Sequence, residues 1–140
     1  MERTDLSQHR VLLAGPKTHG MLLLRSVMGI AGVGKVLHIE DGRRALELLG
    51  MEHFNAVFYE HGAASIDGKP FIVAARRSDA ILNPMIAIFA LAERARRRDV
   101  EAARDTGVTD VLTTPISPRT ILTKLRTAAE TPRPFIVAKE

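Results

Sequence analysis

The sequence predicts an α/β fold in which five parallel strands form one sheet with helices on both faces. Short apolar runs alternate with amphipathic segments along the chain. The runs are apolar almost throughout, which is typical of strands buried on both faces. Enough chain separates them for the helical crossovers that parallel strands need. The 140 residues, 46% hydrophobic and 26% charged, suit one globular domain.

Each expected strand is a short run that Gly, Pro, Asn or Asp introduces or ends, because these residues favour turns. The five strands are expected at residues 11–14, 36–40, 56–59, 85–90 and 110–113.

Five helices are expected between and after these strands. The first begins near Thr18, and the second follows the turn at Asp41. Pro70 is expected in the first position of the third helix, where its missing N–H costs nothing. The fourth helix covers the arginine-rich residues 91–107 and ends at a glycine, and the last begins after Ser117.

The domain is expected to span residues 10–129, with an N-terminal extension at 1–9 and a C-terminal tail at 130–140. The tail sequence TPRPFIVAKE contains two prolines, which rule out a continued helix. We expect its apolar residues 135–138 to form either an added edge strand or a docking peptide.

Composition excludes several classes of function. The chain has no cysteine, so disulfides and thiolate metal sites are excluded and a reducing cytoplasm is its expected location. The apolar stretch 21–34 is interrupted by Arg25 and is shorter than the ~20 residues of a membrane span. The net charge of +4 favours an anionic partner, although an excess of this size also fits an ordinary solvated surface.

The third expected strand ends on Glu60, followed at once by His61. This places a carboxylate at the mouth of the sheet. The five histidines do not have the spacing of metal ligands, and we expect His61 to be a solvated loop residue rather than a ligand or base. No serine and histidine pattern indicates a nucleophile. The sequence therefore predicts no enzyme, cofactor or metal.

Several motifs in order resemble one family: VLLA, VLHIEDGRRALELL, NAVFYE with IDG after it, NPMIAIFA and DVEAARDTGVTDVLTTPISPRTIL. The chain resembles the receiver domains of two-component response regulators over residues 10–129. The resemblance implies a flavodoxin-like, doubly wound, five-stranded parallel sheet with helices on both faces. Ligands of such sheets bind at the carboxyl ends of the strands.

The resemblance also implies which positions carried phosphoryl transfer in the family. An acidic pair that holds Mg²⁺ falls on Gly15 and Pro16, and the phosphoacceptor aspartate falls on Glu60. The Thr or Ser of the fourth strand falls on Phe89. The lysine that precedes the proline after the fifth strand falls on Thr114, and the aromatic of the fifth strand falls on Val111. The degenerate pocket is thus expected to comprise Gly15, Pro16, Lys17, Glu60, Phe89, Thr114 and Pro115.

These replacements predict a pseudo-receiver that is not phosphorylated. Mg²⁺ is usually held by one or two carboxylates plus phosphate oxygens, and Glu60 is the one acid expected in this mouth. Charge on a transferring phosphoryl group would have no cationic partner. Two interpretations of Glu60 remain open: a mimic of the phosphorylated state, or a rim acid neutralised by Lys17.

Arginine is the other strong signal. Its planar guanidinium suits phosphates and guanine edges. We expect a partner or anionic-ligand face built from Arg76, Arg77, Arg94, Arg96, Arg97, Arg98, Arg104 and Arg119. A solvated basic helix is the plain alternative. One Tyr and five Phe leave little for base stacking, which argues against nucleic acid.

The predicted function is a stand-alone module that acts by protein–protein contact, independent of phosphorylation, in a bacterial two-component or motility pathway. Its partner would be a kinase, a phosphotransfer protein, a flagellar motor component or a second copy of the chain. The alternative is a cyclic di-GMP effector. Some degenerate receiver-like proteins bind that ligand through arginines, and the Arg-x-x-Asp spacing occurs at 76–79 and 96–99.

Overall fold

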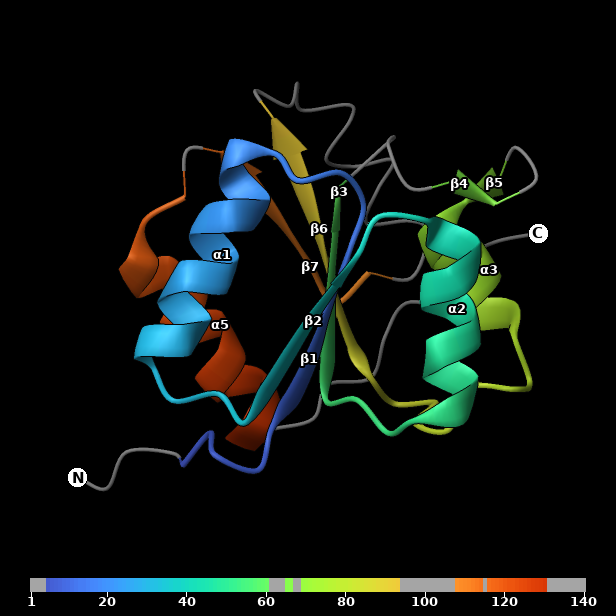
Figure 1. Ribbon diagram of the computed structural model, residues 1–140, viewed down its shortest axis with the longest axis horizontal. Helices are drawn as coiled ribbons and strands as arrows, with labels where there is room; N and C mark the ends of the chain where they lie inside the picture. The colour runs from blue at the N-terminus through green and yellow to red at the C-terminus, as the bar shows by residue number, and fades with distance from the viewer. Residues whose placement is uncertain (1–4, 61–64, 67–68, 94–107, 115, 131–140) are drawn as a thin grey trace.

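The computed structural model of the chain describes residues 5–60, 65–66, 69–93, 108–114 and 116–130. Five strands form one parallel sheet in the order β2-β1-β3-β6-β7, with helices on both faces (Figure 1). The predicted fold class is confirmed. The elements are β1 Arg10–Ala14, α1 His19–Ile30, β2 Lys35–Ile39, α2 Gly42–Met51, β3 Ala56–Glu60, β4 Ser65–Ile66, β5 Lys69–Pro70, α3 Phe71–Arg77, β6 Ala87–Glu93, β7 Asp110–Thr114 and α5 Pro118–Glu130.

The first two helices begin where polar side chains can cap them. The Oγ1 of Thr18 accepts a hydrogen bond from the backbone N–H of Met21 at 3.2 Å. The carboxylate of Asp41 accepts one from the N–H of Arg43 at 3.2 Å. Both residues have extended backbone and satisfy donors that the first helical turn leaves open. The predicted starts of these helices are confirmed.

The core has two layers, one on each face of the sheet. Helices α2 and α3 pack on one face over a cluster that includes Leu12, Tyr59 and Ile88. Helices α1 and α5 pack on the other over a cluster that includes Phe58 and Phe89, whose rings stack with centroids 4.7 Å apart. Alternate residues of each central strand thus enter opposite layers, as the apolar runs predicted.

The fourth expected strand differs from the structure at both ends. It was expected at residues 85–90, whereas β6 runs from Ala87 to Glu93. Leu91 and Ala92, expected to open a helix, are strand residues with 0% and 5% exposure. The reason is tertiary: β3 and β7 pair with β6 on its two sides and bury these residues. Residues 94–107 of the expected helix lie outside the described residues.

Pro70 does not occupy the first turn of α3. It ends β5, which pairs antiparallel with β4, and the helix begins at Phe71. A proline is tolerated there because β4 and β5 form a two-stranded sheet, so that both are edge strands and need not donate hydrogen bonds on both sides. At the other end of the chain, the Oγ of Ser117 accepts from the N–H of Thr120 at 3.2 Å and caps α5 as predicted.

Leu6 and His9 of the expected N-terminal extension pair through their carbonyl oxygens with the backbone at the start of β2. Leu6 is 3% exposed, and its carbonyl oxygen accepts a hydrogen bond from the N–H of Gly34 at 3.0 Å. In the part of the chain that the structure describes, no helix has both the length and the apolar character to cross a bilayer. The tail at 131–140 lies outside the described residues.

Candidate functional site at the carboxyl edge of the sheet

Glu60 is the last residue of β3 and is half-buried at the carboxyl edge of the sheet. Its strand neighbours Val57, Phe58 and Tyr59 are buried, so the apolar run fixes the strand and delivers Glu60 to the edge. The backbone register places Leu91 of β6 opposite Glu60, and Leu112 of β7 opposite Leu91. Both leucines are buried and belong to the α1 and α5 layer.

Gly15 brings the end of β1 directly against Glu60. A Cβ on Gly15 would lie 3.2 Å from the Cβ of Glu60, which is tighter than ordinary contact. Gly15 also has a φ of 125°, a conformation that favours glycine. Its N–H donates to the carbonyl oxygen of Ile39 at 3.0 Å. An aspartate or glutamate at this position would have a strained backbone, and its side chain would crowd Glu60.

His38 is a residue of this edge that the sequence analysis did not single out. Its Nε2 lies 2.9 Å from the carbonyl oxygen of Gly15, so Nε2 carries the hydrogen of this contact. Residue 38 lies opposite Leu13, one residue before the strand ends. The alternation of side chains along β2, together with its pairing with β1, indicates that His38 lies near Gly15. That inference requires knowing that β1 and β2 are neighbours in the sheet.

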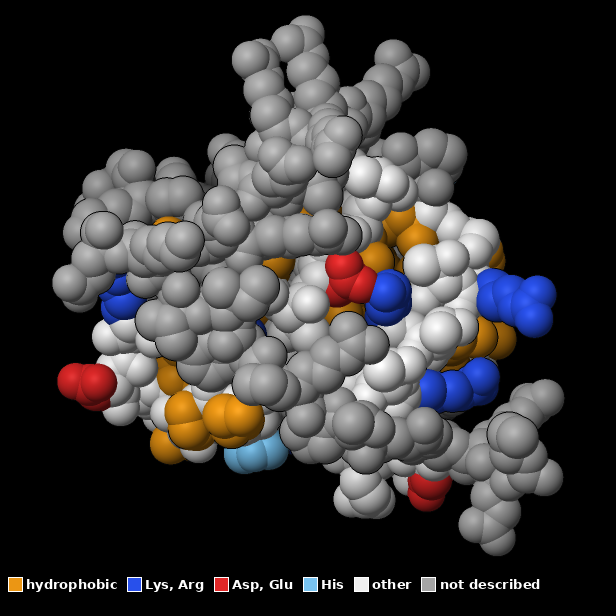
Figure 2. Space-filling model, turned by 180° about the vertical axis from the view of Figure 1, so that it is seen from behind, with side chains coloured by type: hydrophobic (Ala, Val, Ile, Leu, Met, Phe, Trp, Pro, Cys, Tyr) orange, Lys and Arg blue, Asp and Glu red, His pale blue; other side chains and the backbone are white. Residues whose placement is uncertain are grey.

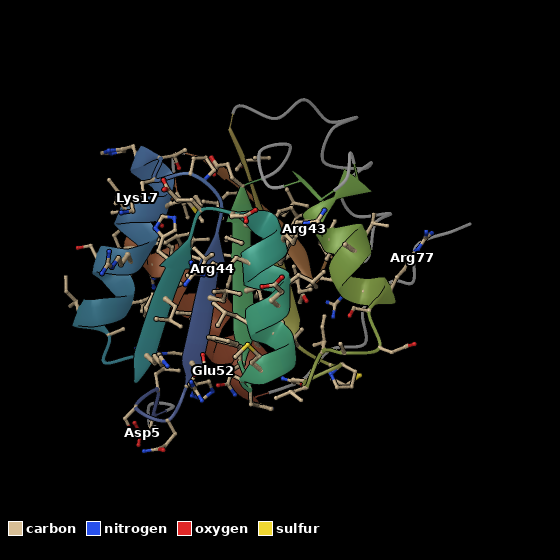
Figure 3. The ribbon with its side chains drawn as sticks, turned by 45° about the vertical axis from the view of Figure 1, so that its right-hand side comes forward. Asp5, Lys17, Arg43, Arg44, Glu52 and Arg77 are labelled. Carbon is tan, nitrogen blue, oxygen red and sulfur yellow. The ribbon has the colours of Figure 1, made fainter. Side chains whose placement is uncertain are left out.

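Basic side chains surround the same edge. Lys17, like Pro16, is exposed in the turn before α1, and Arg43 and Arg44 are exposed in the first turn of α2. Figure 3 shows Lys17 and Arg43 toward one end of the molecule, with Glu52 and Asp5 toward the other.

The structure does not bring every residue of the expected pocket to Glu60. Phe89 lies opposite Phe58, two residues deeper than the row of Glu60 and Leu91, and it is 2% exposed. Thr114 ends β7 two residues beyond Leu112. Val111 packs against the layer of α2 and α3. Pro115 and His61 lie outside the described residues.

The described residues of this edge do not fit a magnesium site. Mg²⁺ requires near-octahedral oxygen coordination, normally with one or two carboxylates. Gly15 and Pro16 offer no side-chain oxygen where the resemblance places the acidic pair, and Leu91 offers none beside Glu60. No group of three or more His, Asp or Glu side chains comes together among the described residues.

The expected arginine face does not form one surface in the structure. Arg77 is exposed at the end of α3, and Arg119 is exposed in the first turn of α5. These helices lie on opposite faces of the sheet, so Arg77 and Arg119 belong to different layers. The arginines at positions 94, 96, 97, 98 and 104 lie outside the described residues.

Arg76 faces the protein rather than solvent. Its Nη1 donates a hydrogen bond to the carbonyl oxygen of Ile86 at 2.9 Å. Burial lowers the pKa of Arg76 to about 10, because the charged guanidinium has lost much of its water. The Arg-x-x-Asp spacing at 76–79 therefore does not present two exposed ligand-binding side chains.

The solved structures that resemble this chain share one architecture. No family profile matches the chain, and no curated protein matches it. A response regulator from Desulfuromonas acetoxidans is similar with a TM-score of 0.76 and 15% identity, over 87% of this chain and 97% of that one. The receiver domain of the Francisella response regulator 1452 gives 0.75 and 16%, over 90% and 100%.

A chemotaxis response regulator, CheY4 of Vibrio cholerae, is similar with a TM-score of 0.68 and 21% identity, over 86% of this chain and 98% of that one. All three identities are low, so the likeness concerns the fold. The order of strands, the two helical layers and these neighbours lead to one conclusion: the chain has the receiver-domain fold of response regulators.

Proposed function

We propose that the chain is a receiver-like signalling module of a bacterial two-component or motility pathway, working in the cytoplasm by protein contact and without phosphorylation. Its fold supports a role in signalling of the response-regulator type. Its partner would be a kinase, a phosphotransfer protein or a flagellar motor component.

The row of residues around Glu60 carries this proposal. Glu60 is wedged between Gly15, whose Cβ position lies 3.2 Å from its own, and Leu91, its partner in the register. Phosphoryl transfer requires groups that neutralise the charge developing on the phosphoryl oxygens. Glycine and leucine side chains supply none. The strand frame that positions a phosphoacceptor is kept, while Gly15 and Leu91, which lie directly beside Glu60, carry no charged side chain.

Acetyl phosphate tests the first half of the proposal. The full chain is incubated with acetyl phosphate and Mg²⁺, and its intact mass is measured beside a phosphorylatable receiver domain as positive control. We expect no phosphoryl adduct on this chain. A hydroxylamine-labile adduct that is present in the native chain and absent from Glu60→Gln would contradict the proposal.

Binding measurements test the second half. A partner captured from the native cell is purified, and its affinity is measured for the native chain, Glu60→Gln and Arg119→Glu. Glu60→Gln should leave the affinity within about twofold, because the carboxylate is not the signal. If α5 is part of the contact, Arg119→Glu should weaken the affinity for an acidic partner about tenfold.

Arg25→Glu, exposed on α1, is the matched control for the change of charge and should bind normally. Loss of affinity in Glu60→Gln alone would make the carboxylate a mimic of a phosphorylated state. Equal losses in Arg119→Glu and Arg25→Glu would show a nonspecific effect of charge and remove α5 from the contact.

A further inference from the structure

A cavity of about 180 Å³ lies at the amino edge of the sheet, opposite the edge of Glu60. It opens between the starts of the central strands and the last turns of α5. Its polar rim includes His9, Asn55 and Asn83, and the ion pair of Asp110 and Lys124 lies in its wall. The apolar part of its wall includes Val11, Ala56, Ala87, Phe89 and Leu125.

The cavity suits one aromatic ring. An apolar cavity of about 150 Å³ holds a benzene molecule. Met85 stands at the rim and is 51% exposed, so apolar surface continues from the cavity to the outside. Seen from behind, hydrophobic side chains reach the surface around an adjoining acidic and basic side chain (Figure 2).

The chain contains one phenylalanine that could fill it. Of the five in the sequence, Phe54, Phe58, Phe71 and Phe89 are between 0% and 2% exposed. The fifth is Phe135, in the tail that follows α5. We propose that the C-terminal tail of this chain docks at the amino edge, with the ring of Phe135 in the cavity.

The tail begins beside the cavity and is long enough to enter it. Thr127 and Ala128 of α5 line the cavity, and the helix ends at Glu130. Prolines at 132 and 134 prevent the helix from continuing. The five residues that follow Glu130, up to Phe135, span at most about 17 Å when extended. A ring at 135 can therefore return to a cavity that the preceding helical turn lines.

The handedness of the fold argues against the tail as a parallel strand beside β7. Helices α1 and α5 lie on the same face of the sheet (Figure 1). A right-handed crossover through α5 must then place the next strand on the side of β7 that β2 takes relative to β1. The order β2-β1-β3-β6-β7 puts β6 on that side. Docking of the tail as a peptide meets no such conflict.

A cysteine pair tests the docking directly, because the chain has no cysteine of its own. Met85→Cys is combined with Ile136→Cys in the full chain, and disulfide formation is followed on non-reducing gels. A disulfide requires the two Cα atoms to come within about 7 Å. The control pair combines Ile30→Cys with Ile136→Cys, since Ile30 is 86% exposed at the end of α1 and does not line the cavity.

We expect the Met85 pair to form a disulfide within the monomer at least about ten times faster than the control pair. Adding Phe135→Ala should remove this preference and lower the melting temperature of the cysteine-free chain by ~5 °C, because the ring returns to water. Equal rates for the two pairs would overturn the proposal. A disulfide-linked dimer would overturn it in favour of the tail of a second copy.

Discussion

At the amino edge of the sheet, hydrogen bonds join side chains that lie far apart in the sequence, whereas at the carboxyl edge the backbone of Gly15 lies directly against Glu60. At the amino edge, Arg10 Nη2 donates to Glu52 Oε1 at 2.6 Å, and the backbone N–H of Arg10 donates to Asn55 Oδ1 at 2.8 Å. At the carboxyl edge, the Nε2 of His38 lies 2.9 Å from the carbonyl oxygen of Gly15.

Under the proposed function, this difference allows the fold to be kept while the residues expected to carry phosphoryl transfer are replaced. In open α/β sheets the ligand-binding residues lie at the carboxyl ends of the strands. If the side chains that align the strands lie at the other edge, replacements around Glu60 remove a function without separating the strands. The two edges therefore predict different responses to substitution.

Two glycines, one at each edge, give the largest expected difference. A Cβ on Gly34 would lie 2.1 Å from the carbonyl oxygen of Ser7, so Gly34→Ala must displace backbone. We expect a loss of about 3 kcal/mol or more in the free energy of unfolding. Gly15→Ala puts alanine at a positive φ, with its Cβ 3.2 Å from the Cβ of Glu60. It should lower the free energy of unfolding by ~2 kcal/mol. Urea denaturation measures both.

Gly29→Ala is the matched control, because no atom beyond its chain neighbours and the surrounding helix backbone lies within 4 Å of its Cβ position in α1. It should raise stability by up to ~1 kcal/mol through helix propensity. If Gly15→Ala costs more than Gly34→Ala, the carboxyl edge is the more tightly constrained one and the comparison is reversed.

The sequence predicted the elements well where local signals determine them. Thr18, Asp41 and Ser117 marked helix starts that the structure has, and the apolar runs predicted all five strands of the sheet. The end of β6 was missed, because Leu91 and Ala92 suit a helix locally and become strand residues only by pairing with β3 and β7.

Only those parts of the candidate site that depend on local signals could be predicted. Gly15 directly follows β1 and Glu60 ends β3, and neighbouring parallel strands bring such residues together. That Leu91 rather than Phe89 lies beside Glu60 depends on strand register, which local sequence does not specify. Nor does sequence separate Arg76 from Arg77: the phase of a seven-residue helix decides which of them turns inward.

These two arginines offer a sharper test of the amino edge. Arg76 Nη1 donates to the carbonyl oxygen of Ile86, the residue before β6 begins, at 2.9 Å. Arg76→Ala should cost ~2 kcal/mol of stability, because this carbonyl loses its charged donor and the helix loses packing. Arg77→Ala, one residue later and exposed, should change stability by less than ~0.5 kcal/mol.

Thermal denaturation of the two variants in parallel provides the measurement. Similar stabilities for Arg76→Ala and Arg77→Ala would show that the contact with Ile86 contributes nothing to holding the start of β6. The amino edge would then rest on fewer side chains than the comparison assumes.

The smallest effect is expected from charge at the amino edge. The hydrogen bonds from Lys35 at 3.2 Å and Arg10 at 2.6 Å lower the pKa of Glu52 below its usual value of 4.5. A carboxyl whose folded pKa is lowered contributes stability that is present above its usual pKa and is lost as the pH falls through the folded value. Glu52→Gln should therefore melt slightly below the native chain at pH 7.

That difference should shrink as the pH falls below about 4.5 and disappear at the acid end, where Glu52 is protonated in both the folded and the unfolded chain. Melting temperatures at pH 7 and at successively lower pH values measure it. Glu47→Gln, on the exposed side of α2, removes the same charge away from Arg10 and Lys35 and serves as the control. A difference for Glu52→Gln that persists unchanged into acid would show that shape and packing, rather than charge, account for the contribution of Glu52 to the amino edge.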